Sequence, residues 1–172
     1  MMDIQALLSD APKGEVSEDN DGLQVIFRRH YRKPIAKVWA ALTAPERIAD
    51  WLGAAEIDLR PGGSLRLTFN ESHSAEIEIT EVDAPRLFAW VWTIEGRATR
   101  VRFELTPEGD GTRLTLTHSG LSTRAGRDSM VRAGWHAHLE GLADAIDGRA
   151  TPWSVKQQRE AAVAPLYPDL PA

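Results

Sequence analysis

Residues 34–53, PIAKVWAALTAPERIADWLG, contain two short helical patterns in succession. Pro34 stands where a helix tolerates proline, in the first turn, and apolar residues follow it at helical spacing. Pro45 interrupts this pattern and begins the second, which Gly53 can end. The apolar positions are Ile35, Val38, Trp39 and Leu42, and then Ile48, Trp51 and Leu52. We therefore expect a helical hairpin that closes one end of an apolar pocket, with the rest of the chain as the other walls.

Alternation of apolar and polar residues predicts strands on both sides of the hairpin. Turn signals separate the segments after the hairpin, including Pro61-Gly62 and Asp110-Gly111. The expected strands are residues 23–31, 55–59, 64–69, 74–82, 86–94, 99–106 and 112–119. Their short sequential connections favour antiparallel neighbours, so the segments predict a meander.

One face of this sheet is predicted to be apolar, because the residues between the apolar positions are mostly arginine, glutamate and threonine. The inward positions are Leu65, Leu67, Phe69, Ala75, Ile77, Ile79, Val101, Phe103, Leu105, Leu114, Leu116 and His118. Residues 86–94 carry apolar side chains on both faces. We expect the larger set to face inward, namely Phe88, Trp90, Trp92 and Ile94.

Residues 123–148 predict a long helix that covers the apolar face of the sheet. Its apolar stripe consists of Val131, Gly134, Trp135, His138, Leu139, Leu142, Ala145 and Ile146. Off the stripe lie Arg132, His136, Glu140, Asp144 and Asp147. Gly134 lies on the stripe and Gly141 at its edge, and each destabilises a helix by about 1 kcal/mol relative to alanine. Either the helix approaches the sheet closely at these glycines, or they leave room for a guest.

Length and composition suit one soluble domain, because the chain has 172 residues of which 42% are hydrophobic. The sequence contains no cysteine, which excludes disulfides, thiolate metal sites and cysteine nucleophiles. No apolar run approaches the roughly 20 residues that span a bilayer, so we expect no membrane span. The N-terminus also lacks the features of a secretion signal, and we therefore expect a cytoplasmic protein.

The net charge of −5 is concentrated at the N-terminus. Residues 1–22 carry six acidic residues and one lysine, so the remaining chain is nearly balanced. Without a basic stripe, nucleic acid is not an expected partner. We expect a flexible acidic leader over residues 1–22, in which residues 4–8 could form one helical turn, then a domain over 23–148 and an extension over 149–172.

No metal site or cofactor is predicted. His136 and His138 are two residues apart on a helix, so their side chains point about 200° apart and cannot share an ion. The sequence also lacks a glycine-rich phosphate loop and a dinucleotide fingerprint, since RPGGSLRL at 60–67 joins two strands and does not open a helix.

Four segments in this order resemble the START-like (SRPBCC) superfamily, and specifically the domain shared with the activator of heat-shock protein 90 ATPase. They are KPIAKVWAALTAPERIADWLG (33–53), IDLRPGGSLRL (57–67), GDGTRLTLTHSGL (109–121) and GWHAHLEGLADAI (134–146). The resemblance covers about residues 23–148. It implies an α+β helix-grip fold, with a curved antiparallel sheet of about six or seven strands and two short helices after the first strand, wrapped around a long C-terminal helix. It also implies an internal cavity for a hydrophobic small molecule.

Our main hypothesis is binding of a hydrophobic or aromatic small molecule, with any catalysis unassigned. The candidate ligand-binding residues are Trp51, Phe69, Trp90, Trp92, Phe103, Leu116, His118, Met130, Trp135 and His138. The tryptophans at these spacings also suit an ordinary packed core, because each can bury roughly 150–250 Å².

An enzyme is the first alternative, of the cyclase/aromatase-like or another lyase type. His118 or His138 would act as general base, and Arg29, which continues the inward parity of Val25 and Phe27, would stabilise an oxyanion. The structural alternative is that the histidines are buried core residues whose pKa is lowered by desolvation, and that Arg29 reaches solvent.

A protein-interaction module related to the chaperone activator is the second alternative. A chaperone partner is nevertheless not expected, because residues 1–22 are too short to match the additional N-terminal domain of that activator. The extension over 149–172 predicts a short helix at 154–164 and carries apolar residues throughout. It either wraps its own domain, crosses to a neighbouring subunit in a homodimer, or lies across the cavity mouth.

Overall fold

The computed structural model describes residues 11–124 and 129–171. Within these residues the strands are β1 Glu15–Asp19, β2 Gly22–Tyr31, β3 Ala54–Ile57, β4 Ser64–Asn70, β5 His73–Asp83, β6 Leu87–Ile94, β7 Arg97–Glu108 and β8 Gly111–Leu121. The helices are α1 Ile35–Thr43, α2 Pro45–Trp51, α4 Ser129–Ile146 and α5 Trp153–Val163, followed by the 3₁₀ turn η2 Ala164–Leu166. The helical turn expected at residues 4–8 lies outside the described residues.

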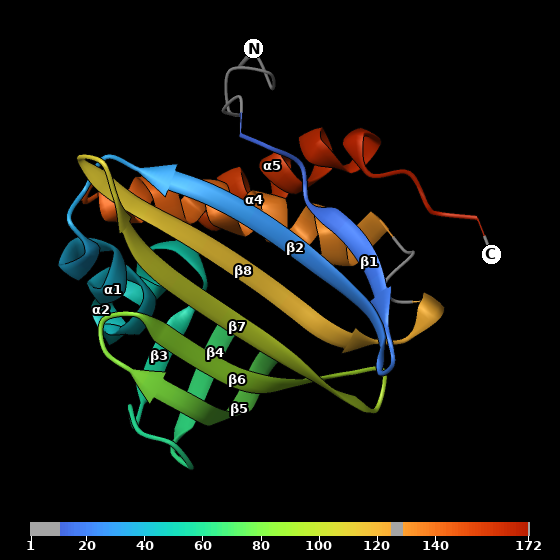
Figure 1. Cartoon of the computed structure of the whole chain (residues 1–172), viewed down its shortest axis with the longest axis horizontal. Coiled ribbons are helices and arrows are strands. Elements are labelled where there is room, and N and C mark those ends of the chain that lie inside the picture. Colours follow the sequence, from blue (N-terminus) through green and yellow to red (C-terminus); the bar gives the residue numbers. More distant parts are fainter. Residues whose placement is uncertain (1–10, 125–128, 172) are drawn as a thin grey trace.

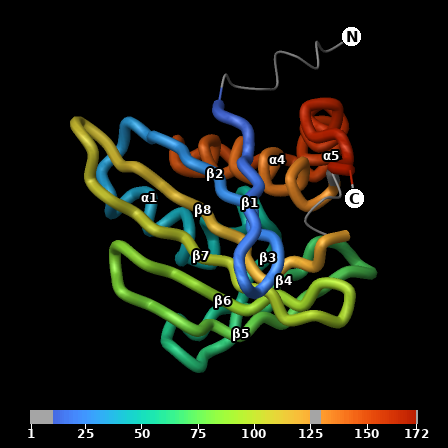
Figure 2. The backbone as a smooth tube through the Cα atoms, turned by 45° about the vertical axis from the view of Figure 1, so that its right-hand side comes forward, coloured from blue at the N-terminus to red at the C-terminus, as the bar shows by residue number. Residues whose placement is uncertain are grey.

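A single antiparallel sheet curves around α4, as the helix-grip expectation requires (Figure 1). Its strand order is β1-β2-β8-β7-β6-β5-β4-β3. Because β2 pairs with β8, the first and last long strands lie side by side, as the second and third strands of the sheet. Figure 2 shows α4 running along one side of the sheet, with α5 next to it. The α+β helix-grip prediction is therefore confirmed.

The helical hairpin forms where the sequence predicts it. Pro34 precedes the first residue of α1, and Pro45 is the first residue of α2. The indole N–H of Trp51 donates a hydrogen bond to the backbone oxygen of Ala41 at 2.8 Å and so joins the two helices. Trp51 is fully buried, because α4 packs against α2.

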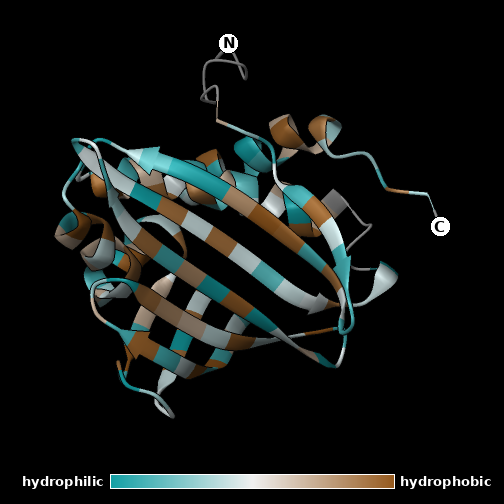
Figure 3. Ribbon diagram, viewed as in Figure 1, coloured by the Kyte–Doolittle hydropathy of each residue, from teal (hydrophilic) through white to brown (hydrophobic). Residues whose placement is uncertain are grey.

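The concave face of the sheet carries the core, as the alternation predicts. Apolar and polar residues alternate along β7 and β8 in Figure 3. In β6 the larger set does face the core: Phe88 and Trp90 are buried in it, while Trp92 and Ile94 pack against it. The opposite set lies on the outer face, where Ala89 and Val91 are neighbours of Arg100 and Arg102.

Within the described residues the sheet has eight strands, one more than the sequence predicts. The additional strand lies in the segment expected to be a flexible leader. β1 pairs antiparallel with the outer edge of β2, from Glu15 opposite Ile26 to Asp19 opposite Gly22. Only Val16 of β1 packs against the core, so the segment shows little apolar alternation. Its backbone hydrogen bonds to β2 and the turn at Gly22, where φ is 131°, hold it in place.

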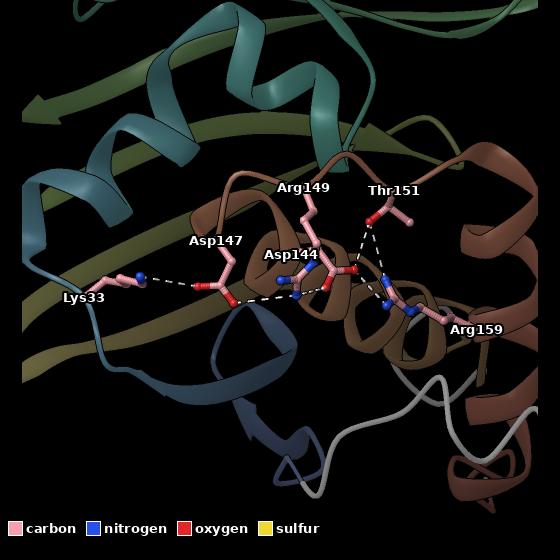
Figure 4. Close-up of polar contacts among 6 residues, drawn as sticks. All are labelled: Lys33, Asp144, Asp147, Arg149, Thr151 and Arg159. Carbon is pink, nitrogen blue, oxygen red and sulfur yellow. Dashed lines mark hydrogen bonds and ion pairs between the residues drawn. The ribbon is translucent and has the colours of Figure 1, made fainter.

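The C-terminal extension folds back on its own domain. α5 and η2 pack against α4, which agrees with the first of the three alternatives. Asp144 near the end of α4 accepts hydrogen bonds from Arg159 at 2.8 Å, Arg149 at 3.0 Å and Thr151 at 3.2 Å (Figure 4). This contact fixes α5 beside the helix that the sheet surrounds.

The extension also changes the environment of the residues off the apolar stripe of α4. Arg132, His136 and Glu140 are 4%, 2% and 7% exposed. Tyr167, which follows η2, reaches back so that its hydroxyl lies 2.6 Å from Nδ1 of His136 and accepts a hydrogen bond from the backbone N–H of Gly14. Consequently α4 is buried on two sides, between the sheet and the two ends of the chain.

Candidate functional site

A small pocket opens between the sheet and the first half of α4, with a volume of about 140 Å³. We call it the aromatic pocket. Its lining residues are Trp92, Ile94, His118, Met130, Val131, Gly134, Trp135 and His138. The indole of Trp135 forms its centre, edge-on to Trp92 at 5.9 Å and to His138 at 6.1 Å between ring centroids. No lysine, arginine, aspartate or glutamate occurs among these described lining residues.

His118 is held in a chain of hydrogen bonds at the wall of the aromatic pocket. The indole N–H of Trp135 donates to Nδ1 of His118 at 2.9 Å, and Nε2 lies 2.7 Å from Oγ1 of Thr99. The hydroxyl of Thr99 in turn donates to the backbone oxygen of Trp92. This order of donors assigns the ring proton of His118 to Nε2. Both ring nitrogens are therefore already engaged.

Burial lowers the pKa of His118 to about 4, so the ring is neutral at pH 7. A neutral imidazole with both nitrogens hydrogen bonded positions the indole of Trp135 and is not poised to accept a proton from a substrate. The arrangement favours the structural interpretation of His118 over the role of general base.

His138 is placed differently. Burial, with a smaller contribution from the charge of Lys156, lowers the pKa of His138 to about 4, against a hydrogen bond to the backbone of Trp51 that raises it. Its Nδ1 atom is buried, and within the described residues nothing hydrogen bonds to it. The ring itself is partly exposed and lines the pocket. His138 thus lines the pocket and carries a buried ring nitrogen that has no hydrogen-bond partner among the described residues.

The two glycines of α4 behave in opposite ways. A Cβ atom built on Gly134 would meet no described atom within 4 Å, whereas one on Gly141 would lie 3.4 Å from Cβ of Trp51. Gly134 fits the alternative of room for a guest, whereas Gly141 lies close to α2 and not, as expected, to the sheet. Gly141 permits close approach to α2, and Gly134 leaves room beside the aromatic pocket.

The structure brings together half of the residues proposed for ligand binding. Five of them line the aromatic pocket, namely Trp92, His118, Met130, Trp135 and His138. Met130 is 68% exposed and lies at the mouth of the pocket. Four others lie within the filled core, namely Trp51, Trp90, Phe103 and Leu116. Phe69 stacks on Trp92, with 6.5 Å between ring centroids, and is not among the lining residues of the pocket. The pocket also includes Ile94, Val131 and Gly134, which were not proposed as site residues. The sequence did place Ile94 on the inward face of the sheet, and Val131 and Gly134 on the apolar stripe of the helix.

The three candidate catalytic residues are not assembled in one place. Arg29 pairs with Leu114 in the sheet, four residues along β8 from His118, which corresponds to about 13 Å. Arg29 lies instead in a separate pocket between β2 and α4, with Tyr31, Leu139, Glu140 and Ala143. We call this the β2–α4 pocket. The side chain of Arg29 is buried there and does not reach solvent, contrary to the structural alternative.

Two further features bear on the class of site. In the part of the chain that the structure describes, no group of three or more histidine, aspartate or glutamate side chains could hold a metal ion. None of the helices in the described ranges is long and apolar enough to cross a membrane.

Residues 32–147 match the protein family described as "Activator of Hsp90 ATPase homolog 1-like protein". The chain belongs to this family. The matched segment contains the hairpin, the strands β3 to β8 and α4, but it leaves out β1, β2 and α5. All lining residues of the aromatic pocket fall within the matched segment, whereas α5, which packs against α4, falls outside it.

Solved structures of similar proteins agree with this assignment. The crystal structure of CalU16 from Micromonospora echinospora is 31% identical and has a TM-score of 0.65, over 90% of this chain and 95% of CalU16. The protein encoded by gene BPP1335 from Bordetella parapertussis is 28% identical, with a TM-score of 0.63 over 89% of this chain and 90% of its own. DynU16, a putative protein in the dynemicin biosynthetic locus, is 25% identical, with a TM-score of 0.68 over 74% of this chain and 48% of DynU16. No curated protein sequence matches the chain.

Proposed function

We propose that this AHSA1-like protein binds an uncharged small molecule through one aromatic ring, which enters the aromatic pocket beside Gly134. The observation that carries the proposal is the open space at Gly134 within a ring of aromatic side chains. Elsewhere in the core the predicted ligand-binding tryptophans Trp51 and Trp90 are fully packed, so the room for a guest is local.

The size and charge of the aromatic pocket define the guest. An apolar protein cavity of about 150 Å³ is large enough for benzene, so a pocket of about 140 Å³ suits one ring or the ring end of a larger molecule. Its described lining carries no charged side chain, and both histidines are neutral at pH 7. A charged guest would lose its hydration without gaining an opposite charge, which favours a neutral one.

Nδ1 of His138 adds a polar preference. A buried ring nitrogen without a hydrogen-bond partner destabilises a protein by roughly 1–3 kcal/mol, and a guest hydroxyl could satisfy it. A phenol would combine the ring with such a donor. The neighbour DynU16 is a putative protein in a biosynthetic locus, which is consistent with a role in handling such a compound.

The proposal is tested by substituting Gly134 with a large and a small residue. Gly134→Leu places a side chain in the open space, whereas Gly134→Ala adds only a methyl group at the same helical position. We expect phenol and 2-naphthol to shift the NMR signals of the Trp92, Trp135 and His138 side chains in the unmodified protein. Gly134→Leu should weaken this binding by about tenfold or more, and Gly134→Ala by less than about threefold.

Equal binding by the Gly134→Leu protein, or no saturable shift with either compound, would overturn the proposal. Because leucine and alanine both favour helix over glycine, each variant should remain at least as stable to heat as the parent protein. Native mass spectrometry of protein purified from its own host, followed by denaturing extraction, would then identify the natural guest.

A further inference from the structure

The β2–α4 pocket has a volume of about 530 Å³. It lies on the side of α4 that faces β2 and the N-terminal segment, away from the aromatic pocket. Its volume is within the range of about 300–1,000 Å³ that is usual for small-molecule sites. Leu139 and Ala143 of α4 give it an apolar wall, and Arg29 and Tyr31 of β2 give it a polar one.

The polar wall contains two buried donor atoms that have no hydrogen-bond partner among the described residues. Arg29 and Tyr31 are 7% and 9% exposed, and they are two residues apart on the same face of β2. Nη1 of Arg29 donates to the backbone oxygens of Pro12 and Arg28, both at 2.8 Å. Nη2 of Arg29 and the hydroxyl of Tyr31 are buried, and neither has a hydrogen-bond partner among the residues that the structure describes. Both atoms are hydrogen-bond donors on residues that line the pocket, and a small turn of either side chain toward the pocket would present its donor to an oxygen bound there.

The charges in the pocket are already close to balance. Glu140, 7% exposed on the α4 side, lines the same pocket as Arg29, and its carboxylate lies 3.6 Å from Nε2 of His136. At the mouth, Arg113 pairs with Glu108 and Arg28 pairs with Glu15. An anionic guest would add an uncompensated negative charge beside Glu140, whereas a neutral oxygen acceptor would leave the balance unchanged.

We propose that the β2–α4 pocket is a second small-molecule site, which binds a neutral carbonyl compound such as an amide. The carbonyl oxygen accepts hydrogen bonds from Nη2 of Arg29 and the hydroxyl of Tyr31, and the apolar part of the compound packs on Leu139 and Ala143. This site is independent of the aromatic pocket, and it shares no lining residue with it.

The test is an NMR titration with benzamide, nicotinamide and N-methylacetamide, with benzoate as the charged counterpart of benzamide. We expect the amides to shift the ring signals of Tyr31, and benzamide to bind more tightly than benzoate. Tyr31→Phe removes only the hydroxyl and should weaken benzamide binding by about fivefold or more. Arg29→Met should weaken it further, while Arg66→Met, which removes an exposed arginine of β4, should leave it unchanged.

Three outcomes would overturn the proposal: no shift of Tyr31 with any of the amides, tighter binding of benzoate, or equal benzamide binding by the Tyr31→Phe protein. Gly134→Leu separates the two sites, because it should leave the amide titration at Tyr31 unaffected while it blocks phenol. The absence of amide binding would thus leave the proposal for the aromatic pocket unaffected. The absence of phenol binding would likewise leave the proposal for the β2–α4 pocket unaffected.

Discussion

His118 and His138 show how two histidines on the same core can differ through their neighbours. His118 is enclosed by Trp135 and Thr99, while His138 keeps one nitrogen unsatisfied beside the aromatic pocket. The sequence predicts the inward direction of both, because each lies on an apolar face. It cannot supply their partners, since the distance between a strand residue and a helix residue depends on the packing of the two elements.

Both histidines make the stability of the protein depend on pH. Their pKa is lowered to about 4 in the folded state, so between pH 6.5 and 4 the unfolded chain binds more protons. The free energy of unfolding should therefore fall as the pH decreases through this window, by at most about 1.4 kcal/mol per pH unit for each histidine. Urea unfolding at a series of pH values measures this fall. The unfolding free energy of His138→Gln should decline less steeply than that of the parent protein, and an identical decline would contradict a lowered pKa for His138.

The hydrogen-bond chain of His118 can be tested by removing its last member. Thr99→Val keeps the shape of the side chain but leaves Nε2 of His118 without its partner in a buried site. We expect a loss of about 1–3 kcal/mol in the free energy of unfolding, measured with urea at pH 7. Thr80→Val, on the outer face of β5, is the control and should change stability little. Similar losses of unfolding free energy in the two variants would show that the hydrogen bonds of His118 contribute nothing to stability.

At the scale of elements, the docking of α5 on α4 depends on Asp144. Burial alone would raise the pKa of Asp144, but the hydrogen bonds from Arg159 and Arg149 outweigh it and hold that pKa below its ordinary value. Asp144→Asn should lower the free energy of unfolding by roughly 1–3 kcal/mol, because it weakens charge-assisted hydrogen bonds. Hydrogen exchange of the backbone amides of α5 should accelerate in parallel.

Asp147 provides a matched control for this prediction. It lies three residues further along and pairs with Lys33 at 3.8 Å and Arg149 at 3.6 Å, but its side chain is 44% exposed. Asp147→Asn should therefore cost less than about 1 kcal/mol. An equal effect of the two substitutions would indicate that general surface charge, and not the buried contact with Arg159, holds α5.

Elements with a clear period were predictable, and β1 was not. α1, α2 and the strands of the meander follow from apolar residues that recur at 3.6 or 2 positions, with prolines and glycines at the ends. β1 has the sequence EVSED, whose one core-packed residue and three acids are typical of a solvated tail. Its pairing depends on the free edge of β2, which is a property of the assembled sheet.

At the scale of the whole molecule, Tyr167 connects the two ends of the chain. Its hydroxyl accepts from the backbone N–H of Gly14 and contacts His136 of α4, so one atom joins the N-terminal segment, the central helix and the C-terminal extension. Sequence patterns could indicate that the extension was too apolar to be idle. They could not indicate that it meets residue 14, because this contact spans nearly the whole chain.

Tyr167→Phe tests this connection. Removal of the hydroxyl should lower the free energy of unfolding by about 1–3 kcal/mol and accelerate hydrogen exchange at both Gly14 and the residues of η2. Tyr31→Phe removes a hydroxyl that has no hydrogen-bond partner among the described residues and should change stability little. If exchange rises only in η2, the two ends are held independently.

The pairing of β1 has a practical consequence for anyone who shortens the protein. Removal of residues 1–22 as a dispensable acidic tail would remove β1, the partner of β2, and leave the remaining nine residues of β2, 23–31, at the border of the sheet. Its uncovered N–H and C=O groups would offer a template to other chains, without the acids of β1 that now discourage such pairing. Shortened versions should therefore begin before Glu15, and those that begin at residue 23 should aggregate at concentrations where the full chain stays dispersed.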